Sequence, residues 1–229
     1  MKLSIHTPKG QYRYKFVPIY EGIKPIDKAV ARENLFLLQD ICRRGGVDFL
    51  LFYGTLLGAL REKDFIAHDE DIDLAMPKER MDDFLSLLFS LREEGFEVVR
   101  YERRGFMSIM RKGEYIDFYF FHPYSGHAGL DCCAREIVPS KYIRSTSTIE
   151  FLGRSFTVLA EGEGFLEFYY GAGWRTPVQC FNYGMSPLSR FKAWATQYCK
   201  ALLPVAVTEA LQRRKDAPIQ AARLRELGF

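Results

Sequence analysis

The hydrophobic and polar positions of the chain follow two periods, one typical of helices and one typical of strands. Apolar side chains recur at roughly helical spacing over residues 25–44, where Pro25 and Asp27 mark the start and Gly45-Gly46 the stop. The same spacing predicts a long helix over residues 78–94, opened by Pro77, and another over residues 162–170. The apolar stripe of residues 78–94 is typical of a helix that packs on a core.

Strand-like patterns fill the intervals between these helices. Residues 47–53 form an apolar run that ends in Gly54-Thr55 and returns to helical character at residues 56–61, which predicts a strand, a tight turn and a helix. Further strands are predicted at residues 71–76, 96–103, 106–111 and 115–121, in a pair within 142–159 that turns at Gly153-Arg154, and at 11–17 as a short edge strand or arm. The short turns between residues 96 and 121 predict a meander. Together these elements predict an α+β fold, with a mixed sheet flanked by helices.

Composition is that of an ordinary globular protein. The 229 residues are 48% hydrophobic and 27% charged, which excludes wholesale disorder and a polytopic membrane protein. The first residues lack the apolar core of a secretory signal, so we expect a cytoplasmic location. The odd number and scattered positions of the cysteines predict reduced structural thiols, although adjacent Cys132 and Cys133 could also ligate a metal or form a redox pair; the five are Cys42, Cys132, Cys133, Cys180 and Cys199.

Charge divides the chain into two parts. Residues 186–229 carry eight Lys or Arg against three acids, a net of +5, so the remainder carries −2 of the total of +3. We therefore expect a catalytic domain at 1–185, with its motifs within 35–178, and a basic helical extension at 186–229. This extension contacts either an anionic surface, such as membrane lipid or a polyanionic acceptor, or simply solvent and the domain. Its candidate apolar face comprises Phe191, Ala195, Tyr198, Leu202 and Leu203, beside Lys192 and Lys200.

Acidic side chains in strand patterns carry the candidate chemistry. Asp71 and Asp73 alternate with apolar residues, so both should point to one face of a strand. Asp117 is a single acid inside an otherwise apolar strand, where burial is costly unless something pairs with it. Three carboxylates on neighbouring strands predict a site for Mg²⁺ or Mn²⁺, with two ions in the fullest form. Gly54-Thr55 before a helix start would suit the phosphates of a donor.

Three segments resemble the LicD/fukutin family: YGTLLGALR at residues 53–61, FIAHDEDIDLAM at 65–76 and YGAGWRTP at 170–177. The resemblance implies a nucleotidyltransferase-like fold and transfer of a phospho-alcohol, such as phosphocholine or ribitol phosphate, from a CDP-linked donor to a sugar hydroxyl of a glycan. It implies that Asp71, Asp73 and Asp117 bind metal and are catalytic. The implied substrate-binding residues are Gly54, Thr55, Arg61, His68, Asp69, Trp174 and Arg175.

Some of these positions have a second interpretation or depart from the family pattern. Arg61 would neutralise the donor diphosphate or form a salt bridge to the acidic loop. Asp69 would bind the metal indirectly, through water, or only cap the entry of the strand. His68 stands where the family usually has Trp, and it either touches substrate or holds its own backbone. The expected partners are a CDP-linked donor and a glycan or glycolipid, without nucleic acid. The alternatives are nucleotidyl transfer that releases pyrophosphate and a silent scaffold of a glycan-assembly complex.

Overall fold

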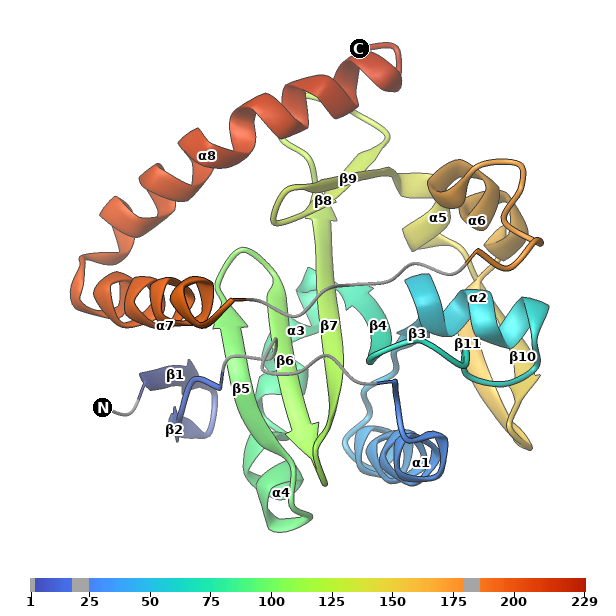
Figure 1. Ribbon diagram of the computed structural model, residues 1–229, viewed down its shortest axis with the longest axis horizontal. Helices are drawn as coiled ribbons and strands as arrows, with labels where there is room; N and C mark the ends of the chain where they lie inside the picture. Colours follow the sequence, from blue (N-terminus) through green and yellow to red (C-terminus); the bar gives the residue numbers. More distant parts are fainter. Residues whose placement is uncertain (1–2, 18–24, 179–185) are drawn as a thin grey trace.

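The computed structural model describes residues 3–17, 25–178 and 186–229. Within these ranges a mixed sheet is flanked by helices, which confirms the predicted α+β class (Figure 1). The strands are β1 (Leu3–Thr7), β2 (Gly10–Tyr14), β3 (Leu50–Leu51), β4 (Ile72–Pro77), β5 (Glu97–Glu102), β6 (Phe106–Arg111), β7 (Glu114–Pro123), β8 (Leu130–Cys133), β9 (Glu136–Pro139), β10 (Thr146–Phe151) and β11 (Arg154–Leu159). The helices are α1 (Lys28–Arg44), α2 (Tyr53–Arg61), α3 (Met81–Leu85), α4 (Leu88–Glu93), α5 (Ser140–Arg144), α6 (Gly162–Tyr170), α7 (Pro187–Leu202) and α8 (Val205–Glu226).

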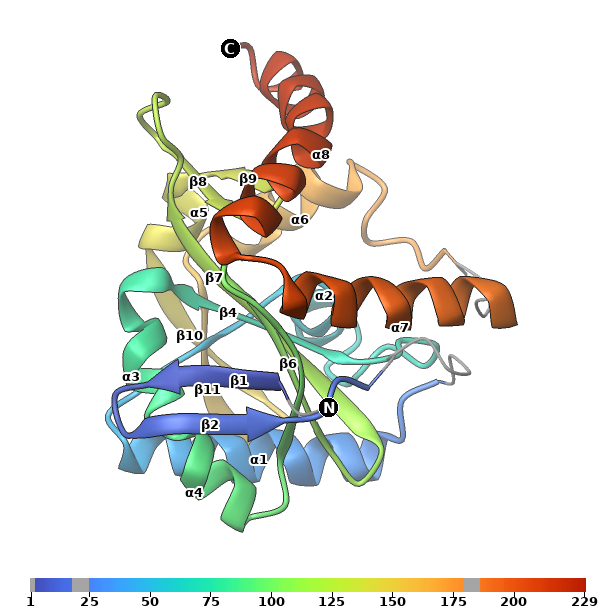
Figure 2. The same ribbon diagram turned by 90° about the vertical axis from the view of Figure 1, so that its left-hand side faces the viewer.

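The main sheet has the order β10-β11-β3-β4-β7-β6-β5, with β8 and β9 continuing from the end of β7. Strands β5, β6 and β7 form the predicted antiparallel meander, and β10 and β11 form the predicted hairpin. The central pair β4 and β7 is parallel. The predicted edge strand is one half of a separate hairpin, β1 and β2, which lies in front of the sheet in Figure 2 and contacts β5.

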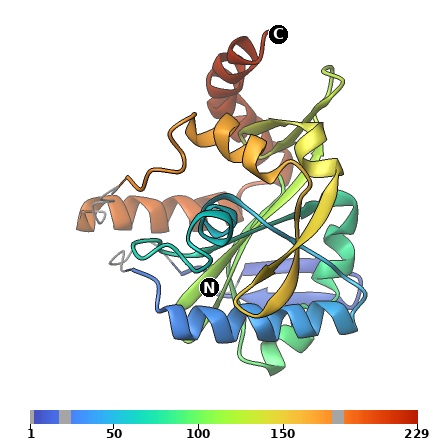
Figure 3. The ribbon, with the colours of Figure 1, turned by 90° about the vertical axis from the view of Figure 1, so that its right-hand side faces the viewer.

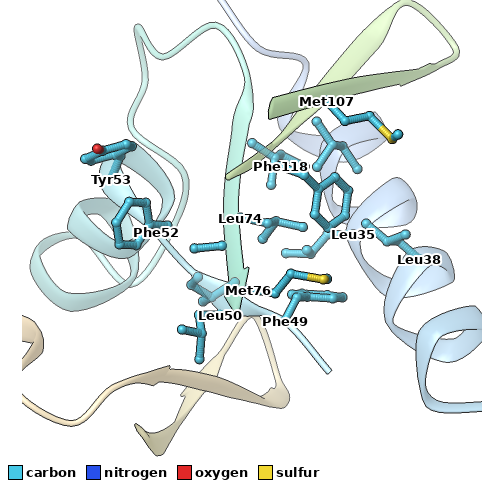
Figure 4. Close-up of a cluster of buried hydrophobic side chains, with 14 of the residues drawn as sticks. Leu35, Leu38, Phe49, Leu50, Phe52, Tyr53, Leu74, Met76, Met107 and Phe118 are labelled. Atoms are coloured by element: carbon cyan, nitrogen blue, oxygen red, sulfur yellow. The ribbon is translucent and has the colours of Figure 1, made fainter. Parts of the chain in front are cut away.

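Alternation along the central strands gives the sheet two different faces. One face of β4 and β7 carries Leu74, Met76 and Phe118, which lie beside Leu35 and Leu38 of α1 (Figure 4). Phe118 also packs on Phe84 of α3. Phe118 is fully buried, and burying such a side chain contributes roughly 1.5–3 kcal/mol. The other face lies under α2 and α6, where Phe52 of the α2 entry packs on Phe165 and Phe121. Figure 3 shows α2 between α1 below and α6 above.

Several boundaries differ from those predicted. Helix α1 starts at Lys28 because the Asp27 side chain caps it, accepting hydrogen bonds from the amides of Ala29 and Val30 at 3.0 and 3.2 Å. The strand expected at 47–53 is reduced to β3, since the following helix already begins at Tyr53. The acid predicted as the first residue of the next strand, Asp71, lies one residue before β4.

The single helix predicted over 78–94 is wrong, because the segment is broken into a 3-10 turn (Lys78–Arg80), α3 and α4. At the break, the Ser86 hydroxyl donates a hydrogen bond to the carbonyl of Asp82 at 2.9 Å. The next residue, Leu87, packs so closely on Gly45 that a Cβ at this glycine would lie 2.5 Å from Leu87 Cδ2. The bend thus seats Leu87 against the end of α1.

The basic C-terminal segment is helical, as expected. Figures 1 and 2 show α8 rising along one side of the body toward β8 and β9. Leu224 of α8, and Leu227 directly after it, pack on a small cluster of Leu130, Cys132 and Ile137. Part of the α8 sequence is therefore packed on the domain, while membrane contact stays a prediction. Among the described residues, no helix combines the length and apolar character needed to cross a bilayer. The side chains of Tyr198 and Leu202, and all of Cys180, lie outside the described part.

Candidate active site

The parallel pairing of β4 with β7 brings two of the predicted acids together. Asp73 and Asp117 are directly opposite in the register, as expected for neighbouring strands, so their side chains leave the same face of the sheet. Asp73 is 8% exposed and Asp117 is 4% exposed. Asp71, just before β4, lines the same pocket.

Contacts with the start of α2 fix Asp73 on both its backbone and its side chain. The Gly54 amide donates to Asp73 Oδ2 at 3.0 Å, and the Asp73 amide donates to Thr55 Oγ1 at 2.9 Å. Glycine is favoured at position 54, since a Cβ there would lie 2.5 Å from Asp69 Oδ2 and the Asp69 side chain would have to shift. Tyr53, the first residue of α2, has a φ of +33°, a backbone conformation that strains a bulky residue. The start of α2 therefore contacts the carboxylates of Asp69 and Asp73 directly.

Asp117 is held by two residues that the sequence did not single out. Ser108 Oγ donates to Asp117 Oδ1 at 2.5 Å, and Arg100 Nη2 donates to Asp117 Oδ2 at 3.1 Å. Arg100 also donates from Nε to Ser108 Oγ at 3.2 Å, and its guanidinium lies 4.0 Å from the centre of the Phe106 ring. The buried acid thus has the partner that its burial demands.

An irregularity in β5 places Arg100 in this contact. The β5–β6 register shifts between Val98 and Arg100, so that Arg100 is opposite Ser108, whereas a register continued unbroken from the Val98–Ile109 pair would have put Val99 there. The extra residue turns Arg100 onto the face that carries Asp117. Without it, successive side chains would have sent Arg100 to the opposite face.

The carboxylates raise one another's pKa. Burial, followed by the charges of Asp73 and Asp117, raises the pKa of Asp71. Burial, followed by Asp69 and Asp117, raises the pKa of Asp73, although the Gly54 amide opposes this shift. Burial also raises the pKa of Asp117 against the opposing effect of Arg100, and raises the pKa of Asp69 to about 6. The positive charge near these buried acids is therefore too small to offset the burial and mutual repulsion of their carboxylates.

These acids line a cavity of about 780 Å³. Six of the predicted site residues contribute to its wall: Gly54, His68, Asp69, Asp71, Asp73 and Asp117. Tyrosines that the sequence did not single out also contribute, namely Tyr53, Tyr115, Tyr119, Tyr169 and Tyr170. Runs of aromatic residues in a strand or helix resemble ordinary core, so their pattern alone could not identify them.

Four predicted substrate-binding residues do not line this cavity. Thr55 is 1% exposed and accepts the amide of Asp73, as described above. Arg61 donates to the Trp174 carbonyl at 3.0 Å and to Glu62 at 2.7 Å. Trp174 is buried, and Arg175 stacks on its ring at 4.3 Å from the ring centre while pairing with Glu163. Arg61, Trp174 and Arg175 thus connect α2, α6 and the loop after α6.

The donor chemistry of the cavity suits a hard cation. Asp71 and Asp73 offer carboxylate oxygens, the ligands that Mg²⁺ prefers, in surroundings where added positive charge would relieve repulsion. In the part of the chain that is described, however, no three His, Cys, Asp or Glu side chains are already grouped as a metal site. Asp117 is instead engaged by Arg100 and Ser108. Asp71 and Asp73 are thus the pair that fits an ion directly.

Comparison with known families assigns residues 46–158 to a nucleotidyltransferase domain. The matching family model is described as LicD/FKTN/FKRP, and the match confirms the resemblance found in the sequence. The match contains the acids, Gly54 and Arg100, but ends before α6, α7 and α8.

Solved structures with some likeness are antibiotic-modifying enzymes. Lincosamide antibiotic adenylyltransferase LnuA, with lincomycin bound, is 14% identical at a TM-score of 0.45, covering 73% of this chain and 94% of that one. The antibiotic-resistance factor ANT(2'')-Ia is 12% identical at a TM-score of 0.47, covering 88% and 100%. Likeness at this level says nothing about substrate. The comparison with curated proteins gave no match.

Proposed function

We propose that this protein is a metal-dependent phosphotransferase that moves a phospho-alcohol from a CDP-linked donor to a sugar hydroxyl and releases CMP. The observation that carries the proposal is the register of Asp73 with Asp117, beside Asp71 and the start of α2, in a LicD/FKTN/FKRP domain. A phosphoryl group is transferred largely by positioning and by electrostatic stabilisation, and these acids and amides supply both.

Each residue has a defined part in the proposed reaction. The donor diphosphate lies near the start of α2, whose dipole favours anions, and Gly54 leaves room there for the Asp69 carboxylate. The acceptor oxygen forms a bond to the phosphorus that carries the alcohol, and the bond from this phosphorus to the bridging oxygen breaks, so that CMP leaves. Asp117 accepts the proton of the acceptor hydroxyl; burial holds its pKa above the ordinary value, which suits a general base. Arg100 and Ser108 keep this carboxylate in place.

Asp71 and Asp73 would hold the Mg²⁺ or Mn²⁺ ion, and a second ion would need Asp117 to exchange its contact with Arg100. Such an ion, when bound, offsets the charge that develops on the transferred phosphate and on the leaving group. Charge from the ion would also relieve the repulsion among the buried acids.

Product analysis tests the proposal. The protein is incubated with Mg²⁺ and either CDP-ribitol or CDP-choline, in the presence of sugars, and with NTPs in parallel; mass spectrometry then identifies CMP or pyrophosphate. CMP release that Asp73→Asn abolishes, while the exposed control Asp82→Asn does not, is the expected result. Pyrophosphate from NTPs would indicate nucleotidyl transfer instead. Absence of both products, together with no Mg²⁺ binding by calorimetry, would indicate a scaffold.

A further inference from the structure

One face of α8 forms part of the wall of the catalytic cavity. Its contributing residues are Gln212, Lys215, Asp216 and Ile219, which follow the i, i+3, i+4, i+7 spacing of a single helical face. These residues lie beyond residue 158, where the match to the family ends. The wall is therefore a feature of this chain that the family motif does not describe.

Several contacts hold α8 in this position. Asp216 is 8% exposed and forms an ion pair with Arg104, which also pairs with Glu102 at 2.8 Å. Gln220 donates to the Ala134 carbonyl at 3.0 Å, and Arg223 lies over the Phe168 ring at 4.4 Å from its centre. These bonds tie the helix to the β5–β6 turn, the β8–β9 turn and α6. The cavity-facing side chains of α8 are thus fixed relative to the acids.

Separate parts of the fold contribute to the wall of the cavity. Gly54 belongs to α2 and His68 to the loop after it, which we call the α2 end; Arg104 and Arg135 belong to the β5–β6 and β8–β9 turns and lie with the α8 residues on what we call the α8 end. In Figure 1, α2 and the first half of α8 lie on opposite sides of β7, the strand that carries Asp117. In-line displacement requires the attacking and the leaving oxygens on opposite sides of the phosphorus. If the donor diphosphate occupies the α2 end, as proposed above, the acceptor must approach from the α8 end.

The charges at the α8 end indicate what kind of acceptor would fit. Three cationic side chains, Arg104, Arg135 and Lys215, are matched there by three acids, Glu102, Glu136 and Asp216. Two of the cations already have acidic partners: Arg104 is paired with Glu102 and Asp216, and Arg135 contacts Glu136 at 3.4 Å. A polyanion would gain little from such a balanced surface. A neutral molecule with several hydroxyls suits it, because amide, ammonium and carboxylate groups can each hydrogen-bond a hydroxyl.

We propose that the Gln212, Lys215 and Ile219 face of α8 binds the acceptor, a neutral sugar or polyol, and that Asp216 positions this face through Arg104. Gln212 and Lys215 hydrogen-bond the hydroxyls, and Ile219 with Tyr169 contacts the apolar side of the ring. The inference rests on the proposed function for the direction of transfer. It adds residues outside the family domain that set acceptor specificity.

Adjacent cationic residues offer a matched pair of variants. Lys215→Ala and Arg214→Ala each remove one exposed positive charge from α8, yet only Lys215 lines the cavity. The assay follows CMP release from CDP-ribitol or CDP-choline with ribitol, methyl β-galactoside or methyl N-acetylgalactosaminide as acceptor. We expect Lys215→Ala and Gln212→Ala to raise the acceptor KM about tenfold, the loss of one good hydrogen bond, with the donor KM unchanged. Arg214→Ala should match the wild type. Equal effects of Lys215→Ala and Arg214→Ala, or a change confined to the donor KM, would overturn the proposal.

Binding of the same sugars, measured by saturation-transfer NMR, separates this inference from the proposed reaction. If no CDP-linked donor releases CMP, the reaction is wrong, and the sugar site is judged by binding alone. Sugar binding that Asp73→Asn retains and Lys215→Ala weakens would support the site in either case. If the wild-type protein binds none of the three probes, the sugar site does not exist.

Discussion

Asp73→Asn should stabilise the metal-free protein while abolishing its activity. The wild-type carboxylate is 8% exposed, and burial, Asp69 and Asp117 all disfavour its charge. Asparagine has nearly the same shape and keeps an oxygen that can accept the Gly54 amide, so the substitution removes repulsion with little loss of hydrogen bonding. We expect a gain of about 1–3 kcal/mol, within the usual range for single substitutions.

Thermal unfolding at pH 7.5, with chelator and with Mg²⁺, measures this gain. For a chain of this size, about 1 kcal/mol shifts Tm by roughly 2–4 °C, so Asp73→Asn should raise the metal-free Tm by several degrees. Mg²⁺ should raise the Tm of the wild type but not that of the variant. The matched control Asp82→Asn, at an exposed position of α3, should follow the wild type in both buffers. If metal-free Asp73→Asn were less stable than the wild type, the idea that the buried Asp73 carboxylate lowers the stability of the folded protein would be refuted.

Three further predictions concern other residues of the site and the thiols. Gly54→Ala should destabilise the fold by about 1–3 kcal/mol, since its Cβ would meet Asp69 Oδ2 at 2.5 Å, whereas Gly173→Ala, with nothing near its Cβ, should be neutral by urea unfolding. Arg100→Lys should lower kcat about 10–100-fold at unchanged Tm, because lysine cannot make both hydrogen bonds of the guanidinium, to Ser108 and to Asp117. Full activity of this variant would exclude a positioning role for Arg100. Among the described cysteines, iodoacetamide at pH 8 should label exposed Cys199 in the native protein and leave the others unlabelled, as judged by peptide mass spectrometry. Burial raises the pKa of Cys42 to about 12 and that of Cys132 to about 11, and it also raises the pKa of Cys133, so these buried thiols form little reactive thiolate at pH 8.

The elements nearest the site were largely predictable from local patterns. The meander, the β10–β11 hairpin and helix α6 follow directly from period and turn residues, as does the adjacency of the Asp73 and Asp117 strands. Gly54 could be singled out because a glycine close to a helix start is a recognisable signal, and it lies in the first turn of α2. These features depend on interactions within one or two neighbouring elements.

The α8 wall could not be predicted in the same way. Asp216 and Arg104 are 112 residues apart, and a basic helix has the same sequence pattern whether it covers a cavity, faces solvent or lies on a lipid surface. Arg61 and Trp174 illustrate a different point, since both belong to segments that resemble the family motif and in this structure Arg61 donates to the Trp174 carbonyl. A sequence motif therefore does not specify whether a residue binds the ligand or stabilises a loop.

Arg100 shows why residue spacing alone can miss a functional contact. Continuing an unbroken register from the Val98–Ile109 pair would place Val99 opposite Ser108 and direct Arg100 to the face away from Asp117. The shift at Val99 leaves Val98 and Val99 both buried and brings Arg100 to the acid, at the cost of a local break in the ladder. Such a break is retained only where something compensates for it, and here the ion pair with a 4% exposed carboxylate does so. The irregularity is therefore best understood as part of the site, because it supplies the one cation that directly contacts the buried Asp117 among the described residues.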